Sequence, residues 1–257
     1  MNIKKKILAF NNKYPNSSFW IGGKHSVVLA IHNPKRKIYK IVLHEKMKNT
    51  NDKIITKHVD KIFFENDKFF SNIFKSEIPH QGYAVLVDKI DHGKFKDFID
   101  KKLKINKNCN IIALDGVNDP RNIGSIVRSA SAFSFDAIII NKKDFNSKSF
   151  LLYKSASGAM ENIPIFEVSN ILNEINILKE RNFYIAGMDM RSQKSIFNFS
   201  ITKKNLIIFG SEEYGLKNLI KSNCDSTYKI PINENIESLN VSNACAATFA
   251  ILNFLQK

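Results

Sequence analysis

The sequence predicts an α/β protein whose C-terminal half contains a parallel sheet covered by helices on both faces. Five apolar runs of strand length lie in that half, at residues 111–114, 137–140, 184–188, 206–209 and 228–232. Apolar residues recur at helical spacing between most of them, across 122–133 and 171–179. Continuous apolar strands that alternate with helices are typical of parallel sheets, because such strands are buried on both faces.

The N-terminal half predicts a smaller α/β domain of its own, at residues 17–90. A turn at Gly22 and Gly23 leads into an apolar-periodic helix that continues to Ala30. An alternating strand follows at 38–43, and a turn with a further strand follows at 78–87.

The remaining segments complete the expected domain organisation. Residues 1–16 are interpreted as a basic leader, and the lysine-rich residues 91–105 as a linker or connecting helix. Residues 106–257 then form the domain that carries the parallel sheet.

Charge is distributed unevenly along the 257 residues, which carry a formal net charge of +15. Residues 1–105 hold 22 Lys and Arg against 10 Asp and Glu, whereas the rest hold 17 against 14. A basic half beside a nearly neutral half suggests a module that binds a polyanion next to a module with another task. A general abundance of Lys, Asn and Ile is the alternative, but it would not by itself favour one half.

Several classes of protein are disfavoured by composition. The longest apolar runs are far too short to span a membrane, and the N-terminus lacks the features of a secretory signal. Cys109, Cys224 and Cys245 have no CxxC spacing, which indicates a reducing compartment and argues against a zinc site. We therefore expect a cytoplasmic protein that needs neither membrane nor metal.

The C-terminal half also lacks histidine, because all six histidines lie at or before His92. Chemistry in that half would use no imidazole base and no Ser-His-Asp triad. No GxGxxG sequence follows a predicted strand, and no GxxxxGK[ST] sequence is present. Dinucleotide-binding and nucleoside-triphosphate-binding functions therefore lack support.

Three polar segments each follow a predicted strand, at residues 115–128, 210–216 and 230–244. The carboxyl ends of parallel strands meet at one edge of a sheet, so these segments can share one crevice. The first segment contains Asn122 and Arg128, and the third contains Ser-Leu-Asn-Val followed by a helix of small residues.

Each segment also has a simpler interpretation. Asn122, Ser238 or Asn240 can cap the helix beside it, and Arg128 can be an ordinary surface residue. Gly210 can serve only a turn. The occurrence of all three segments at strand ends favours a shared site.

The three segments resemble the three motifs of the SpoU, or TrmH-like, RNA 2′-O-methyltransferases. The first reads N-x-G-x-x-x-R from Asn122 to Arg128, and the second reads G-x-E-x-x-G-L from Gly210. The third reads I-P-x-x-x-x-x-E-S-L-N-V from Ile230. Residues 155–159 are also similar to the family, and the resemblance covers essentially all of 106–257.

The N-terminal half narrows the resemblance to one branch. Residues 20–27 resemble the opening of the ribosomal-protein-like RNA-binding domain that precedes the catalytic domain in rRNA enzymes, and residues 80–84 fit the same branch. The chain is most similar to bacterial enzymes that methylate a guanosine ribose in 23S rRNA. It departs from the pattern at Glu213, where the family usually has a small residue, and at Gly22 and Gly23, which shift the opening.

The resemblance implies a C-terminal deep trefoil knot, a homodimer and the cofactor S-adenosyl-L-methionine. It also implies that backbone groups near Gly210, Ile230 and Leu239 hold the cofactor in the knot. The reaction would transfer a methyl group from the cofactor to a ribose 2′-hydroxyl, with 23S rRNA as the RNA partner.

The same resemblance implies catalytic roles for five side chains. Asn122, Ser238 and Asn240 would orient the ribose and the cofactor, and Glu212 would orient Arg128 or its partners. Because a guanidinium stays protonated in proteins, we expect Arg128 to grip a phosphate and stabilise the developing alkoxide rather than act as a base.

Two alternatives remain. A tRNA ribose 2′-O-methyltransferase of the same superfamily is disfavoured by the long N-terminal domain. A ribosome-assembly factor that kept the fold and lost catalysis is disfavoured because the five proposed catalytic side chains are all present.

Overall fold

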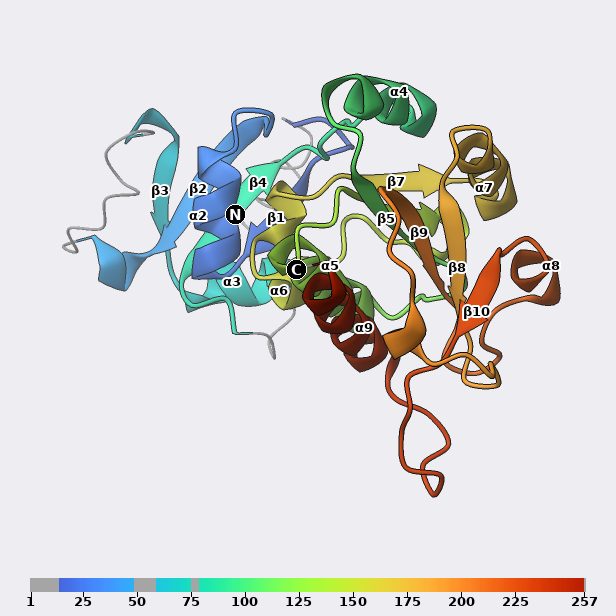
Figure 1. Cartoon of the computed structure of the whole chain (residues 1–257). Coiled ribbons are helices and arrows are strands. Elements are labelled where there is room, and N and C mark those ends of the chain that lie inside the picture. The colour runs from blue at the N-terminus through green and yellow to red at the C-terminus, as the bar shows by residue number, and fades with distance from the viewer. Residues whose placement is uncertain (1–13, 49–58, 75–78, 257) are drawn as a thin grey trace. The chain divides into compact units, whose positions relative to one another are not determined.

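The computed structural model describes residues 14–48, 59–74 and 79–256 (Figure 1). The predicted basic leader, residues 1–16, therefore lies mostly outside the described residues. The chain forms two compact units, of which the first comprises residues up to Asp91 together with 147–161. The second comprises residues 92–146 and 162–257.

The first unit is built on a four-stranded sheet with the order β1-β4-β2-β3. Its strands are β1 (Phe19–Gly22), β2 (Ile38–His44), β3 (Ile62–Glu65) and β4 (Tyr83–Val87). Strand β4 runs antiparallel to β1 and β2, whereas β3 runs parallel to β2. The strand predicted at 38–43 is confirmed as β2, and the strand predicted within 78–87 is confirmed as β4.

Helices α2 (Lys24–His32), α3 (Asp67–Phe74) and α6 (Phe150–Ala156) complete this unit, with short 3-10 turns at Glu45–Met47, Val59–Lys61 and Ala159–Glu161. The helix predicted after the turn at Gly22 and Gly23 is confirmed as α2, and the apolar residues before that turn form β1, which was not predicted.

Helix α6 belongs to the first unit although its sequence lies inside the predicted C-terminal domain. The aromatic rings of Phe150 and Phe74 pack with centroids 4.5 Å apart, and those of Tyr153 and Phe19 with centroids 5.3 Å apart. The buried Ser26 hydroxyl donates to the Tyr153 carbonyl at 3.0 Å. Sequence periodicity does not show to which unit α6 belongs, because that depends on which apolar surface the helix covers.

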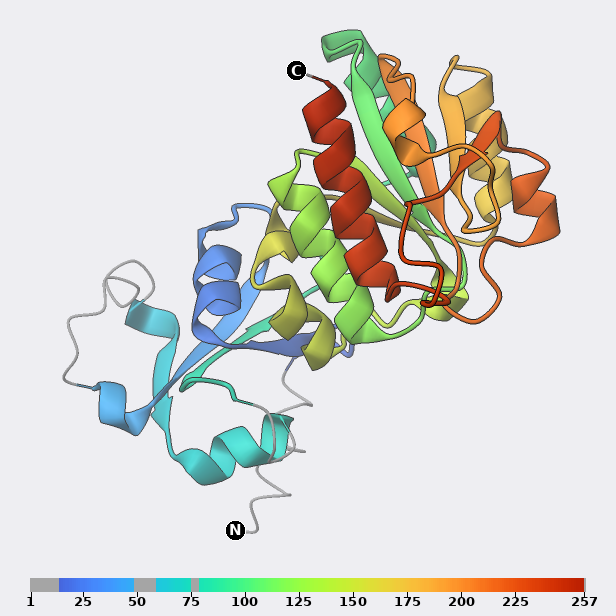
Figure 2. The ribbon, with the colours of Figure 1, turned by 60° about the horizontal axis from the view of Figure 1, so that its bottom comes forward.

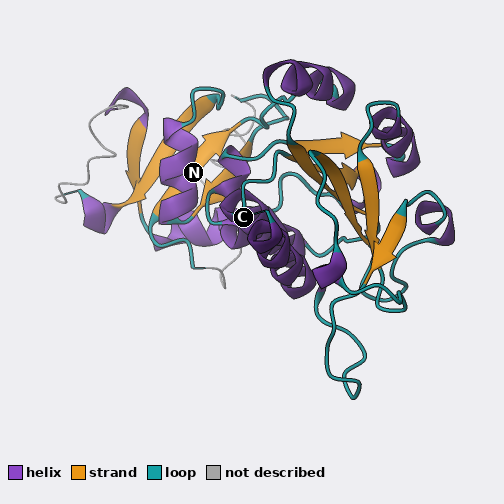
Figure 3. Ribbon diagram, viewed as in Figure 1, coloured by secondary structure: helices purple, strands orange, loops and turns teal. Residues whose placement is uncertain are grey.

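The second unit contains a six-stranded sheet with the order β10-β8-β9-β5-β6-β7, and every pairing is parallel (Figure 3). The strands are β5 (Cys109–Leu114), β6 (Ala137–Asn141), β7 (Ile165–Val168), β8 (Tyr184–Met188), β9 (Lys204–Phe209) and β10 (Ser226–Tyr228). The predicted parallel sheet is confirmed, although the sequence interpretation missed β7.

The strand predicted at 228–232 is wrong beyond its first residue. Strand β10 ends at Tyr228, and the Lys229 amide turns to the Lys194 carbonyl at 2.8 Å. Pro231 follows and has no amide hydrogen with which to continue a ladder. The residues from 230 to 240 form a loop that contains neither helix nor strand (Figure 3).

Helices cover both faces of the sheet: α4 (Phe95–Ile105), α5 (Pro120–Ala132), α7 (Ile171–Lys179), α8 (Asn218–Lys221) and α9 (Val241–Leu255). The segment expected to be a linker or connecting helix contains α4, whose Phe95 and Ile99 are buried in one core with Ile171 and Ile175 of α7. On the other face α9 lies alongside α5 (Figure 2), and Phe249 packs on Phe209 of β9 with ring centroids 5.8 Å apart.

The connections place a crevice at the carboxyl ends of β5 and β9. These strands are neighbours, but the chain leaves β5 toward β6 and leaves β9 toward β10 on the opposite side. Loops that diverge from adjacent parallel strands leave space between them for a ligand. None of the described helices has the length and apolar character needed to cross a membrane.

Candidate functional site

The loop after β9 is a tight backbone turn. Ser211 and Gly215 exchange backbone hydrogen bonds, with the Gly215 amide 2.9 Å from the Ser211 carbonyl. A Cβ on Gly210 would lie 2.1 Å from the Gly215 carbonyl carbon, so only glycine fits there. The turn carries Glu212 at its start.

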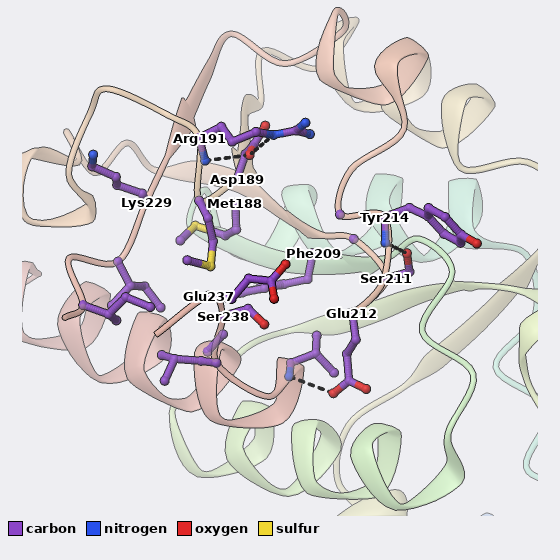
Figure 4. Close-up of a pocket in the computed structure, with 18 of the residues that line it drawn as sticks. Met188, Asp189, Arg191, Phe209, Ser211, Glu212, Tyr214, Lys229, Glu237 and Ser238 are labelled. Carbon is purple, nitrogen blue, oxygen red and sulfur yellow. Dashed lines mark hydrogen bonds and ion pairs between the residues drawn. The ribbon is translucent and has the colours of Figure 1, made fainter. Parts of the chain in front are cut away.

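Glu212 joins the three motif segments. Its Oε1 accepts hydrogen bonds from Asn240 Nδ2 at 2.7 Å, Asn122 Nδ2 at 3.1 Å and the Val241 amide at 3.1 Å. Figure 4 shows the last of these bonds at the first turn of α9. Asn240 Nδ2 also donates to Asn122 Oδ1 at 3.0 Å. We call Asn122, Glu212 and Asn240 the amide–carboxylate cluster.

The helix-capping interpretation holds for one of the three residues to which it was applied. Asn240 is the N-cap of α9, and its Oδ1 accepts from the Ser242 amide at 2.9 Å. Asn122 does not cap α5, because Asp119 takes that position. Ser238 lies exposed in the loop before α9 and caps nothing. The Glu212 carboxylate also lies at the α9 N-terminus, where the helix dipole favours negative charge.

Arg128 lies outside the amide–carboxylate cluster. Its side chain is exposed on α5 and makes no hydrogen bond or ion pair with the residues that the structure describes. Glu212 binds Asn122 and Asn240 and makes no hydrogen bond or ion pair with Arg128 among the described residues, so its role of orienting Arg128 or its partners stays a prediction.

A cavity of about 360 Å³ lies beside the Glu212 turn (Figure 4). All three residues expected to hold a cofactor line it, namely Gly210, Ile230 and Leu239. Met188 and Phe209 supply apolar wall, and Glu237 and Ser238 supply polar groups. The volume falls within the range of pockets that bind small molecules.

Residues 189–191, which follow β8, also line this cavity, and the sequence interpretation did not include them. The available signal was that a polar Asp189 directly follows an apolar strand. Burial alone would raise the pKa of Asp189, but hydrogen bonds from Lys221 Nζ at 2.5 Å and the Arg191 amide at 2.9 Å outweigh it and lower that pKa.

A second cavity, of about 450 Å³, shares residues 211–215 and Val241 with the first. Asn122 lines it, so the amide–carboxylate cluster touches both spaces. Asp115, Lys143 and Asp144 also line it. Among the described residues, no group of three or more His, Cys, Asp and Glu side chains is arranged to hold a metal ion.

The chain is similar to known RNA-modifying proteins. The model of the SpoU rRNA Methylase family matches residues 110–250. A putative TrmH family tRNA/rRNA methyltransferase of Staphylococcus epidermidis is 32% identical over 228 residues, which cover 88% of this chain and 91% of that protein.

Solved structures share the fold along nearly the whole chain. The SpoU methyltransferase AviRb from Streptomyces viridochromogenes, in complex with AdoMet, superposes with a TM-score of 0.79 at 18% identity and covers 100% of this chain and 94% of its own. An AdoMet-bound rRNA methyltransferase from Sinorhizobium meliloti gives 0.78 at 19% identity, covering 97% and 91%. From the family match and the Staphylococcus relative, this chain belongs to the SpoU rRNA Methylase family.

Proposed function

We propose that this TrmH/SpoU-family RNA methyltransferase transfers a methyl group from S-adenosyl-L-methionine to a ribose 2′-hydroxyl, at a guanosine of 23S rRNA. The 2′ oxygen attacks the methyl carbon, the carbon–sulfur bond breaks with its electron pair remaining on the sulfur as a thioether, and the hydroxyl proton passes to water. The amide–carboxylate cluster is the observation that carries this proposal, because it joins the three motif segments between two cavities.

The first cavity fits the methyl donor in size and chemistry. Met188, Phe209 and Leu239 offer apolar surface for an adenine ring, and Glu237 offers a carboxylate for the positive sulfonium or ammonium group. Lys229 lines the same space and offers a cation for the donor's carboxylate. The solved Streptomyces and Sinorhizobium relatives contain AdoMet, which supports the same assignment here.

The amide–carboxylate cluster would hold the ribose side of the reaction in position. Asn240 is fixed by its cap and by Glu212, and Asn122 is fixed by Glu212 and Asn240. Side chains locked in this way lose little freedom when substrate arrives, and alignment alone can supply a large part of the rate. Ser238, which lines the first cavity, would contact the reacting groups from the donor side.

Arg128 would act on the RNA backbone. Its exposure on α5 leaves the guanidinium open to a phosphate, which it can bind through two parallel hydrogen bonds. The same charge would stabilise negative charge that develops on the 2′ oxygen.

The first unit would dock the RNA, since residues 1–91, which make up most of that unit, hold 17 Lys and Arg against 8 Asp and Glu. The boundaries of the RNA-binding domain, the trefoil knot, the homodimer and the cytoplasmic location remain part of this proposal. The resemblance to the family supports them.

The test measures binding and transfer separately. Calorimetry with S-adenosyl-L-methionine is followed by transfer of labelled methyl groups to large-subunit rRNA and to tRNA. Binding together with transfer to rRNA is the expected result. Preference for tRNA would support the other branch of the family, and binding without transfer to any RNA would support a non-catalytic assembly factor.

A further inference from the structure

The second cavity is built where three neighbouring strands end. Asp115 directly follows β5, Asp144 ends the 3-10 turn Lys142–Asp144 after β6, and residues 211–215 follow β9. Asn122, a member of the amide–carboxylate cluster, lines the cavity. A group bound there would therefore lie next to the side chains proposed to hold the ribose.

Asp115 and Asp144, which both line this cavity, each have a buried carboxylate oxygen that receives no hydrogen bond from the described residues. The Asp115 side chain is only 2% exposed. Its Oδ1 accepts from Asn141 Nδ2 at 3.3 Å and pairs with Lys217 Nζ, but its Oδ2 has no partner among the described residues. Asp144 Oδ2 is likewise buried and unpaired. Leaving a buried acceptor unpaired is costly, so a ligand that supplies donors would bind favourably.

Of the four RNA bases, guanine offers two adjacent donors on its Watson–Crick edge, N1–H and the N2 amino group. Adenine, cytosine and uracil each place an acceptor beside a donor on that edge. In hydrogen-bonding character a pair of acceptors therefore suits guanine, whereas each of the other bases would bring an acceptor of its own toward one of them. The exposed Lys143 ammonium lines the same cavity and can donate to guanine O6, the third position of the edge.

We propose that the second cavity holds the base of the nucleotide whose ribose is methylated, and that Asp115 and Asp144 make it selective for guanine. Unstacked RNA bases are commonly read on this edge while an aromatic ring covers one face. Tyr214 is 74% exposed on the turn between the cavities and can supply that ring. This inference rests on the proposed methyl transfer to a guanosine of RNA and assigns the side chains that select that base.

The experiment uses the full chain, labelled methyl donor and total cellular RNA, followed by digestion and identification of the methylated nucleosides. The wild-type protein is expected to give 2′-O-methylguanosine as its product. Asp144→Asn is expected to lower transfer at least tenfold, because the side chain loses its charge and one of its two acceptor oxygens becomes a donor, and Asp144→Glu is expected to recover part of it. Asp97→Asn, which changes an exposed carboxylate on α4, is the matched control and should transfer normally.

Folding is checked by melting and by calorimetric affinity for the methyl donor, both of which Asp144→Asn should leave unchanged. Transfer by Asp144→Asn within twofold of wild type would overturn the inference, and so would a wild-type product other than 2′-O-methylguanosine. Either result would leave ribose methylation standing. Binding of S-adenosyl-L-methionine without methylation of any RNA would refute the proposed function itself, and the proposed base selection would then be refuted as well.

Discussion

Glu161 of the first unit and Glu212 of the second each accept several hydrogen bonds, yet their surroundings differ. Glu161 is 3% exposed and pairs with Arg36 Nη2 at 2.5 Å, while Asn33 Nδ2 donates to it at 2.8 Å. Glu212 is exposed and is held by two side-chain amides and a backbone amide, with no cation bound to it among the described residues.

The difference separates a carboxylate that stabilises a fold from one that arranges a site. The Arg36 guanidinium neutralises Glu161 where both side chains are almost completely buried. The charge of Glu212 remains open at the edge of two cavities, and its donors are the side chains expected to meet substrate. The first arrangement should dominate stability and the second should dominate rate.

The largest expected effect on stability comes from Glu161→Gln. Removing one charge of a buried pair leaves Arg36 uncompensated and should cost about 3–5 kcal/mol in the free energy of unfolding. Urea denaturation measures this change. Glu180→Gln is the control, because Glu180 pairs with Arg181 at the surface and should cost less than about 1 kcal/mol. Equal losses from the two substitutions would remove the distinction.

Glu212→Gln should lower the rate of methyl transfer strongly and change the free energy of unfolding little. Removing the negative charge weakens all three hydrogen bonds that Oε1 accepts, so Asn122 and Asn240 would lose their fixed orientation. Misplaced positioning groups cost on the order of a hundredfold in rate, so labelled methyl transfer should fall by roughly that factor. The affinity for S-adenosyl-L-methionine should change little. Glu234→Gln, in the exposed loop before α9, serves as the control, and Glu212→Gln transfer within twofold of wild type would contradict the assignment.

Asn240 combines both kinds of role, and two substitutions can separate them. Asn240→Ala removes the α9 cap and should cost about 1 kcal/mol of unfolding free energy. Asn240→Ser restores a capping oxygen but cannot reproduce the Nδ2 bonds to Glu212 and Asn122. It should therefore recover most of the stability in urea denaturation while transfer stays low. Recovery of transfer together with stability would reduce Asn240 to a cap.

The smallest effect concerns His80 in the first unit. Its ring stacks on Phe70 with centroids 4.3 Å apart, and burial lowers its pKa below the ordinary 6.5. Because the unfolded chain then binds the proton more tightly, stability contributed by neutral His80 is present above pH 6.5 and is lost as pH falls below it. The melting temperature should drop by roughly a few degrees on acidification. His80→Gln should lessen that drop. An equal drop in melting temperature with this variant would mean that other groups cause it.

The sequence predicted the parallel sheet well because continuous burial produces long apolar runs. Helix α7 matches the predicted 171–179, and the strand over 184–188 matches β8. The strand predicted at 228–232 failed because an apolar run beside Pro231 resembles a strand whether or not a neighbour pairs with it. Pairing is decided by tertiary contacts that periodicity does not contain.

The candidate site was predictable to the level of segments but not of contacts. Strand-end positions bring Asn122, Glu212 and Asn240 together, whereas the separation of Glu212 from Arg128 depends on where each side chain points. The unpaired oxygens of Asp115 and Asp144 carried no sequence signal, since most aspartates are exposed. Only coordinates show that these two acceptors are buried.

The most direct test locates the transferred methyl group. Wild-type protein and Glu212→Gln are each given labelled S-adenosyl-L-methionine and total RNA, and the RNA is cleaved with alkali, which a 2′-O-methylated ribose resists. The account predicts label in alkali-resistant linkages of large-subunit rRNA with the wild type, and strong loss of that label with Glu212→Gln at unchanged donor binding. Label on a base, or no labelled RNA despite donor binding by the wild type, would contradict it.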